Sequence, residues 1–581
     1  MKARKLMALL LAAILIFSVC ACGSSGTSAA SSAPAESAAV SESEASPAEV
    51  SEPEAAAEPE TAEESVPEEV SAEEASEEPE AEPEEPAVVI EYPLFDDTQT
   101  YTIWMGTAPD LNDIVKEMDQ YVIFRELEKV TNVAWDATMV SFMAESEQFQ
   151  LMLAGGDYTD VCCKATENYS GTVDQAIDEE FLIDISPYIA DNMPNLTGWF
   201  KKFPELESQL RSNEGAIGAF PKIYKEYSDI SAGGMIRADW LADLGLDEPK
   251  SFDDLYNVLV AFRDEKGASA PLVIADSTGV QNELISGYNI SAGFYQVDGE
   301  LRFGAVQPEF KEYLTMIHDW YMEGLVDDLF LSNPYGSLMD WSPVLNSTCG
   351  VWYGTAAQAI PNLLSSAVDP GMKITGITTV TKDGSVAHVG ESGSVFDSNL
   401  WSITTVCEDP DVICRYIDYV YSEDGILLAN YGVEGETFEY DASGTPRLTD
   451  LVLNNPEYSY GACMNMYVCD RMTPVPFVID EDRVRADYVE DQINAINVWN
   501  FANDGLYNMP KAGVNLTVEE SQEYNTLYSD IETYMDENVV KFVVGDKSLD
   551  EFDSYVDTLM QMGVDRCTEI EQAAYDRYLE G

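Results

Sequence analysis

The first part of the chain alternates strand-like and helix-like patterns, and this alternation is the strongest constraint on the fold. The strand-like runs are residues 101–105, residues 133–139 and the run from Val161, and the helical runs are residues 111–130 and 149–153. Strand, helix, strand, helix and strand is the order of βαβ units, which build a parallel sheet. Ligands of such sheets bind beyond the carboxyl ends of the strands. We therefore expect Thr107 and residues 164–169 to lie near a ligand site.

The N-terminus has the pattern of an export signal. Residues 1–5 are basic, residues 6–17 are apolar and small residues follow. The apolar run is too short to span a bilayer as a helix. The end of the segment, Val-Cys-Ala-Cys22, resembles a bacterial lipobox, in which the final Cys takes a diacylglycerol. Residues 1–22 are thus interpreted as a lipoprotein signal peptide with Cys22 as the anchor, and an ordinary secretory signal is the alternative.

Residues 23–90 are predicted to be a disordered acidic tether. They hold 20 Glu and no Lys, Arg or Asp among Ser, Ala and Pro, so they cannot bury enough apolar surface to offset the ordering entropy. The remaining body, residues 91–581, carries 27 basic and 86 acidic residues, a balance of 27 − 86 = −59. This charge argues against binding to nucleic acid or, by charge, to anionic lipid. A body of this length is too large for one core, so at least two lobes are expected.

The sequence lacks the motifs of the common catalytic and metal sites. There are two histidines. His318 lies in a helical pattern next to Asp319 and Trp320 and is interpreted as a solvated helix residue, and His388 has no nearby second ligand or nucleophile. No phosphate-binding loop and no calcium loop is present. We therefore predict no catalytic residue, no cofactor and no metal. Of the eight cysteines after Cys22, most are expected to be free thiols, with Cys463 and Cys469 as the best candidates for a bridge.

Residues 233–266 predict two amphipathic helices joined by a tight turn, after a short apolar entry at Met235 and Ile236. Trp240 and Leu241 lie on the apolar side of the first helix, and Gly245 is placed to end it in the left-handed conformation. Ser251 is a plausible N-cap of the second helix, whose apolar residues recur at helical spacing. Further capping boxes begin at Thr517 and Ser548.

In order along the chain, several segments resemble the extracellular solute-binding lipoproteins of carbohydrate ABC importers. They are LMLAGGDYTDV (151–161), MIRADWL (235–241), WYMEGLV (320–326), YGVEG (431–435), KFVVG (541–545) and AAYDRY (573–578). The resemblance implies an α/β fold of the two-lobed periplasmic-binding-protein type (type II), with a hinge and a ligand cleft between lobes. The resemblance places lobe 1 at about residues 91–228 and 376–440, and lobe 2 at about residues 229–375 and 441–581. Residues 211–221 lack the acidic calcium loop of the alginate-binding members.

For a sugar ligand, the site needs aromatic faces for the C–H surfaces of the rings and planar polar groups for the hydroxyls. Trp352 and Tyr353, at a strand end before Gly354, fit this description best, with two core aromatics as the alternative. The other candidates are Asn168 and Tyr169 (a plain loop being the alternative), Arg237 with Trp240 (the apolar side of a helix being the alternative), and Glu391 with Phe396 on a glycine-rich loop. Arg237 would matter for a ligand that carries a carboxylate.

The expected function is that of a lipid-anchored receptor, not an enzyme, that captures an oligosaccharide by lobe closure and delivers it to the permease subunits of an ABC transporter. We expect a monomer on the extracellular face of a Gram-positive cell membrane, held there only by its lipid. Two alternatives stay open: a surface enzyme acting on glycans, and a receptor for a peptide or another polar solute.

Overall fold

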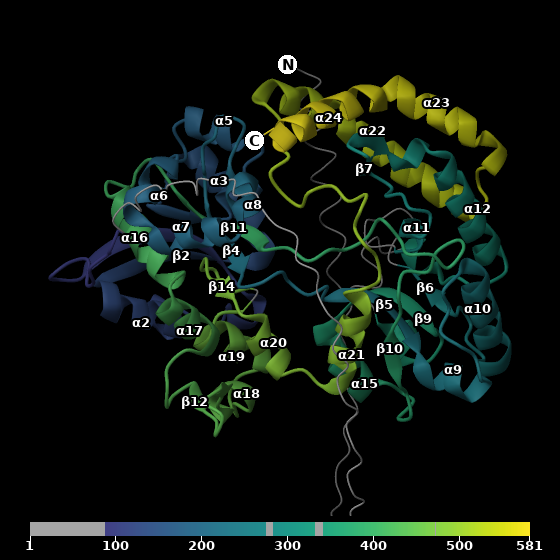
Figure 1. Cartoon of the computed structure of the whole chain (residues 1–581), viewed down its shortest axis with the longest axis horizontal. Coiled ribbons are helices and arrows are strands. Elements are labelled where there is room, and N and C mark those ends of the chain that lie inside the picture. The colour runs from purple at the N-terminus through teal and green to yellow at the C-terminus, as the bar shows by residue number, and fades with distance from the viewer. Residues whose placement is uncertain (1–87, 275–282, 332–340, 471, 581) are drawn as a thin grey trace, which may run out of the picture. The chain divides into compact units, whose positions relative to one another are not determined.

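The computed structural model describes residues 88–274, 283–331, 341–470 and 472–580. The predicted signal peptide, Cys22 and the acidic segment up to residue 87 lie outside the described residues. Within the described ranges, no helix has both the length and the apolar character needed to cross a membrane. Two sheets organise this part of the chain, and we call each sheet, with the elements packed on it, a lobe (Figure 1).

The first lobe is built on a six-stranded sheet that contains the predicted βαβ units. Its strands, in spatial order, are β14 (Val478–Ile479), β4 (Phe220–Tyr224), β11 (Phe396–Ile403), β3 (Val161–Cys163), β1 (Gln99–Thr107) and β2 (Val133–Ser141). β1 pairs in parallel with β2 and β3, whereas β11 runs antiparallel to β3 and β4. Both faces are covered, because Ile103 and Met105 of β1 enter one core and Trp104 enters another.

Helices surround this sheet. They are α2 (Val122–Thr131), α3 (Glu145–Gly155), α4 (Ala165–Asn168), α5 (Val173–Asp178), α6 (Ser186–Asn192), α7 (Pro194–Lys202), α8 (Pro204–Leu210), α16 (Pro410–Val420), α17 (Glu423–Tyr431), α18 (Asp450–Leu453), α19 (Tyr460–Tyr467) and α20 (Glu481–Ala486). The prediction of one helix over residues 111–130 is wrong. Two 3-10 turns, Pro109–Leu111 and Met118–Gln120, precede α2, because the Gln120 side chain accepts from the backbone of Glu117 and closes a separate turn.

The second lobe is built on a four-stranded sheet whose faces are both buried. Its strands, in spatial order, are β10 (Ile374–Gly376), β5 (Ala232–Arg237), β9 (Val351–Ala356) and β6 (Leu272–Val273). The hairpin β7 (Phe294–Val297) and β8 (Glu300–Phe303) accompanies it. Its helices are α9 (Ala238–Leu244), α10 (Phe252–Lys266), α11 (Glu283–Ser286), α12 (Pro308–Met322), α14 (Ser342–Leu345), α15 (Ile360–Ser366), α21 (Glu490–Trp499), α22 (Val518–Val544), α23 (Phe552–Met562) and α24 (Val564–Glu580).

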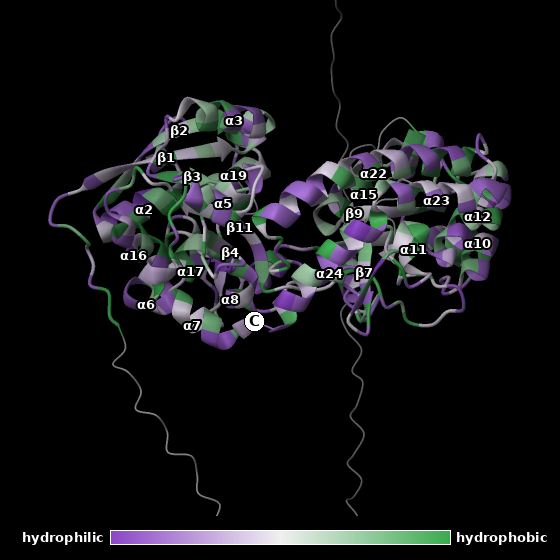
Figure 2. Cartoon of the chain, turned by 90° about the horizontal axis from the view of Figure 1, so that it is seen from above, coloured by the Kyte–Doolittle hydropathy of each residue, from purple (hydrophilic) through white to green (hydrophobic). Residues whose placement is uncertain are grey.

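The helix ends follow the predicted signals. Gly245 ends α9 at φ +65, and Ser251 with Asp254 forms the capping box of α10. Thr517 caps α22 in the same way, and Ser548 caps the turn before α23. α23 is amphipathic, since Phe552, Tyr555 and Leu559 are its buried residues, and Figure 2 shows hydrophilic residues between them.

The expected lobe boundaries need two corrections. Residues 441–486 belong with the first sheet and not with the second, because β14 pairs with β4, and Phe477 packs in the first core. The chain also returns later than residue 376, since Ile377 and Val380 still pack in the core of the second lobe. The return to the first sheet is made by β11, which pairs with β3 and β4, and β14 is added later beside β4.

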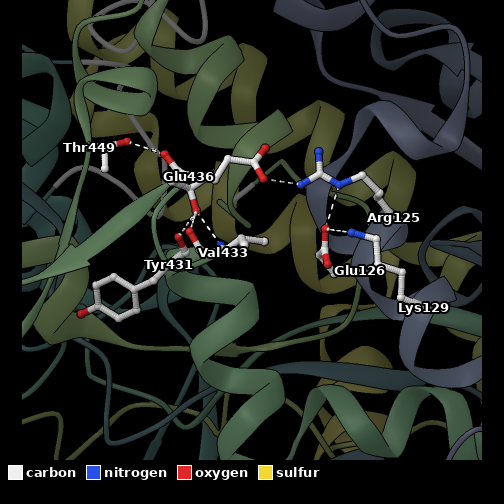
Figure 3. A network of polar contacts seen from close by, with 8 residues as sticks. Arg125, Glu126, Lys129, Tyr431, Val433, Glu436 and Thr449 are labelled. Carbon is white, nitrogen blue, oxygen red and sulfur yellow. Dashed lines mark hydrogen bonds and ion pairs between the residues drawn. The ribbon is translucent and has the colours of Figure 1, made fainter.

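The hairpin β12 (Phe438–Tyr440) and β13 (Pro446–Leu448) is joined to the first lobe by a polar network (Figure 3). Arg125 on α2 donates to Glu126 at 2.8 Å and to Glu436 at 2.9 Å. The backbone carbonyl of Glu436 accepts from the Thr449 hydroxyl at 2.9 Å. These contacts tie the segment before residue 450 to α2.

The eight cysteines of the described ranges are all free and buried. The prediction of a Cys463–Cys469 bridge is wrong, because the two thiols pack in different places. Cys463 lies in a small cluster with Val452 and Met464, whereas Cys469 lies in the core of the first lobe.

Candidate ligand site

A cavity of about 280 Å³ lies where the parallel strands β1, β2 and β3 end. We call it the strand-end cavity. Its lining is Gly106, Ala108, Phe142, Glu145, Cys163, Lys164, Glu167, Lys222, Ser398, Leu400, Met472, Thr473 and Pro474. The residues that follow β1, β2 and β3 all contribute, as the carboxyl-end rule for parallel strands predicts.

Glu145 and Lys164 form a charged wall of this cavity. The Lys164 ammonium lies 3.4 Å from Glu145 Oε2, and Glu145 is itself buried at the start of α3. The carboxylate approaches the backbone of β1 so closely that a Cβ on Gly106 would lie 2.6 Å from Glu145 Oε1. Only glycine allows this approach at the end of β1.

Lys164 also holds an unusual backbone conformation and contacts an aromatic ring. Its φ is +51, in the left-handed region that a lysine rarely adopts. Its backbone N–H donates to Leu400 O at 2.6 Å, which ties the turn after β3 to β11. Its ammonium lies 4.8 Å from the centre of the Phe142 ring. Phe142 keeps 39% of its surface exposed and Met472 keeps 38%, so both offer apolar surface to a ligand.

A second charged group lies between β4 and β11. Lys222 is only 4% exposed, and its ammonium lies 3.0 Å from Asp397 Oδ2. The Tyr224 hydroxyl donates to the same carboxylate at 2.8 Å. Burial alone would raise the pKa of Asp397, but the Lys222 charge and these hydrogen bonds hold it below its usual value. Asp397 is therefore ionised at neutral pH.

Glu167 differs from the other acidic residues of the strand-end cavity, because it makes no hydrogen bond or ion pair with any residue that the structure describes. The cavity walls remove part of its water and raise its pKa, an effect that the nearby Lys164 opposes. Glu167 also lines a second cavity of about 490 Å³, which we call the β11 cavity. Asp174, Phe396, Asp397, Ser398, Asn399 and Asn515 belong to its lining as well.

A third cavity, of about 260 Å³, lies along the segment that leads from the first sheet to the second, and we call it the crossing cavity. Residues 228–233 line it, together with Tyr224, Gly354, Glu391 and Lys511. The Lys511 ammonium lies 3.5 Å from Glu391 Oε2. Of the predicted ligand residues, Glu391 thus lines the crossing cavity and Phe396 the β11 cavity, and their role in binding stays a prediction.

Trp352 and Tyr353 do not face a cavity, so the structure contradicts their predicted role. Both are 0% exposed. Alternation along β9 sends Trp352 into the core that contains Ala495 and Trp499 of α21, and Tyr353 into the opposite core with Ile236. Neither ring offers a face to a ligand, and the alternative of two core aromatics is correct.

Arg237 and Trp240 are structural as well. The Arg237 guanidinium is fully buried and donates to Asp239 at 2.8 and 2.7 Å, to Asp369 at 2.7 Å and to the Ser347 hydroxyl at 3.1 Å. It stacks 4.3 Å from the centre of the Trp240 ring. With two carboxylates already bound, it has no free edge for a ligand carboxylate.

The three remaining candidates lie near the strand-end cavity without lining it. Thr107 is buried at the end of β1, between the lining residues Gly106 and Ala108. The Asn168 side chain donates to Lys164 O at 3.1 Å. Tyr169 is buried beside Phe181 and donates its hydroxyl to Glu179 at 2.7 Å.

The sequence reasoning missed Phe142, Lys222, Asp397 and Met472. Phe142 had a usable signal, because it directly follows β2 and the carboxyl-end rule applies to that strand as well as to its neighbours. Lys222, Asp397 and Met472 come from strands and a loop that join the sheet late, so no local pattern marks them. Among the described residues, no group of three or more His, Cys, Asp or Glu side chains is placed to hold a metal ion.

Comparison with known proteins connects this geometry with a family. A fructooligosaccharide ABC transporter substrate-binding protein of Streptococcus pneumoniae is 23% identical over 80% of this chain and 88% of its own length. A polygalacturonan/rhamnogalacturonan-binding protein of Bacillus subtilis is 27% identical over 54% of this chain, which spans 62% of that protein.

Solved structures agree on the fold. A solute-binding protein of Bifidobacterium longum infantis, associated with an ABC transporter that binds HMO, is 20% identical. It matches with a TM-score of 0.68 over 83% of this chain and 99% of its own. Residues 109–426, more than half of the chain, match the family of bacterial extracellular solute-binding proteins. The chain therefore belongs to the bacterial extracellular solute-binding proteins and has their two-lobed α/β fold.

Proposed function

We propose that the chain is a lipid-anchored extracellular receptor that captures an oligosaccharide and delivers it to an ABC transporter permease, and that it performs no catalysis. The observation that carries this proposal is the strand-end cavity, which combines exposed apolar side chains with charged and hydroxyl groups on one strand edge. Sugars require this combination, because each ring has an apolar C–H face and a rim of hydroxyls. The named ligands of the relatives, fructooligosaccharides and polygalacturonan/rhamnogalacturonan, support the same class.

The residues of the cavity divide these tasks. Phe142 supplies the aromatic surface, and Met472 adds adaptable apolar contact. Glu167, without another partner, accepts hydrogen bonds from ligand hydroxyls. Lys164 donates to ring or hydroxyl oxygens while its pairing with Glu145 fixes its position.

The anchoring and location are inferred from the N-terminus and the family. Cleavage of the signal just before Cys22 leaves this residue, carrying a diacylglycerol, at the start of the mature chain. The acidic segment that follows separates the binding body from the membrane. We infer that the protein is held on the outer face of a Gram-positive cell membrane and acts as a monomer that meets the permease there.

Binding is tested by calorimetry and intrinsic Trp fluorescence with a panel of oligosaccharides on the purified protein. At least one oligosaccharide should bind, and no product should be released on long incubation. Phe142→Ala and Glu167→Gln should each weaken that binding by about tenfold or more, which corresponds to about 1.4 kcal/mol. Phe501→Ala is the matched control, because Phe501 is an exposed phenylalanine, 81% exposed, outside the lining of the three cavities. A folded protein that binds no saccharide, or that cleaves one, would refute the proposal.

A further inference from the structure

The cations of the three cavities all have carboxylate partners, and this limits the charge of the ligand. Each cavity lysine is next to one carboxylate: Lys164 lies 3.4 Å from Glu145, Lys222 lies 3.0 Å from Asp397, and Lys511 lies 3.5 Å from Glu391. An ion pair of this kind neutralises the lysine charge, so none of the three presents an excess positive charge to a ligand.

Carboxylates remain in excess after these pairs are counted. Among the residues that the structure describes, six carboxylates line the three cavities, Glu145, Glu167, Asp174, Asp229, Asp397 and Glu391, against three lysines, Lys164, Lys222 and Lys511. Arg485, outside the lining, neutralises Asp229. Asp174 accepts from the Ser212 hydroxyl. Glu167 makes no contact with a cation, although it lines both the strand-end and the β11 cavity.

Among the described residues, Arg483 is another cation near these cavities, and part of its guanidinium already has protein partners. It lines a smaller cavity of about 90 Å³ that shares Tyr224 with the crossing cavity. Its side chain is almost fully buried, and its Nη2 lies 3.2 Å from Cys469 O and 3.5 Å from Asp470 Oδ1. A bidentate contact with a ligand carboxylate needs two free N–H groups on one edge of the guanidinium. Nη2 of Arg483 already contacts two protein oxygens, and Nε is buried without a hydrogen-bond partner among the described residues.

From this balance we propose that the ligand is a neutral oligosaccharide, one without uronate or sulfate groups. The inference rests on the proposed function and narrows it. A neutral hydroxyl can donate to Glu167 and accept from Lys164, so it forms hydrogen bonds with both charged groups and brings no charge of its own. A uronate at the same place would meet Glu167, which forms no ion pair with a described residue, and the negative field of a body with 86 acidic and 27 basic residues. In this the chain would differ from the polygalacturonan/rhamnogalacturonan-binding protein of Bacillus subtilis.

The test compares oligogalacturonates with the same oligosaccharides after their carboxylates are reduced to hydroxymethyl groups, alongside neutral fructo-, manno- and xylo-oligosaccharides. Calorimetry on the wild-type protein should find a neutral binder, with oligogalacturonates at least about a hundredfold weaker. The affinity for the neutral binder should change little between low and high salt, because no net charge is brought in.

The variants separate this proposal from the function on which it rests. Glu167→Gln should weaken the neutral ligand, and Glu167→Lys should bring oligogalacturonate binding into the measurable range; circular dichroism checks that both variants fold. If oligogalacturonates bind the wild type more tightly than their reduced forms do, the proposal of a neutral ligand is refuted, but the proposed capture of an oligosaccharide is not. A protein that binds neither series nor any other saccharide would refute the proposed function itself.

Discussion

Replacing Arg237 tests whether this residue stabilises the second lobe or binds ligand. The structure assigns it to stability. Its guanidinium makes three hydrogen bonds to two carboxylates, at 2.7 to 2.8 Å, and is fully buried against Trp240. Arg237→Met keeps most of the side-chain volume but removes the charge and leaves Asp239 without its cation. The pKa of Asp239, which burial alone would raise, is now held below its usual value mainly by Arg237.

The size of the effect follows from burial. Removing one partner of a buried ion pair costs about 3–5 kcal/mol, because the other charge stays buried without compensation. The Asp369 side chain is 40% exposed and can regain water, so we expect the lower end, about 3 kcal/mol. At about 2–4 °C for each kcal/mol in a domain of 150–250 residues, the melting temperature should fall by about 6–12 °C.

Urea unfolding followed by Trp fluorescence, with a thermal melt alongside, measures this loss. Arg566→Met is the matched control, since Arg566 also bridges two carboxylates, Glu523 at 2.8 Å and Glu569 at 3.1 Å, but on the surface. Solvent screens such a pair, so the control should melt within error of the wild type. The reasoning is refuted if Arg237→Met is no less stable than Arg566→Met, or if the folded variant loses saccharide binding.

Three further predictions concern packing, pH and thiols. Gly233→Val should destabilise the fold by about 1–3 kcal/mol, since a Cβ there would lie 2.6 Å from the Trp499 ring. Gly198→Ala, at an exposed helix position with free space around it, should stabilise the fold by up to about 1 kcal/mol. Urea midpoints that do not separate in this order would contradict the packing. Burial raises the pKa of Asp418 from 3.8 to about 6. The folded state therefore holds this proton more tightly than the unfolded state. As the pH rises from 4 to 7, the wild type should lose about 2 kcal/mol of stability relative to Asp418→Asn, whereas a constant difference would exclude the shift. The eight buried thiols should react with a thiol reagent only after unfolding, because burial shields them and raises, for example, the pKa of Cys407 to about 12. Dithiothreitol should leave the melting temperature unchanged, and a lower melting temperature in its presence would reveal a disulfide.

Local signals predicted much of the fold. The strand and helix alternation identified the parallel strands β1, β2 and β3, and the capping boxes at Ser251 and Thr517 marked true helix starts. These features depend on residues within a few positions of each other. Membership of β14 in the first sheet was not predictable in this way, because it depends on pairing with β4, more than two hundred residues earlier.

The site was predicted less well, and Trp352 shows the reason. A strand end before a glycine looks the same in sequence whether its side chains face a cleft or a core. What covers Trp352 is α21, whose Ala495 and Trp499 lie far along the chain. The carboxyl-end rule, by contrast, needs only the strand order, and it led to the neighbours of Gly106 and to the segment that holds Lys164 and Glu167.

The central claim is that the strand-end cavity binds a saccharide, and a crystal structure with a bound oligosaccharide tests it most directly. The ligand is the tightest binder found by calorimetry. The account predicts a sugar ring against Phe142 with a hydroxyl within hydrogen-bond distance of the Glu167 carboxylate. A saccharide bound elsewhere, with Phe142 and Glu167 still facing solvent, would contradict it.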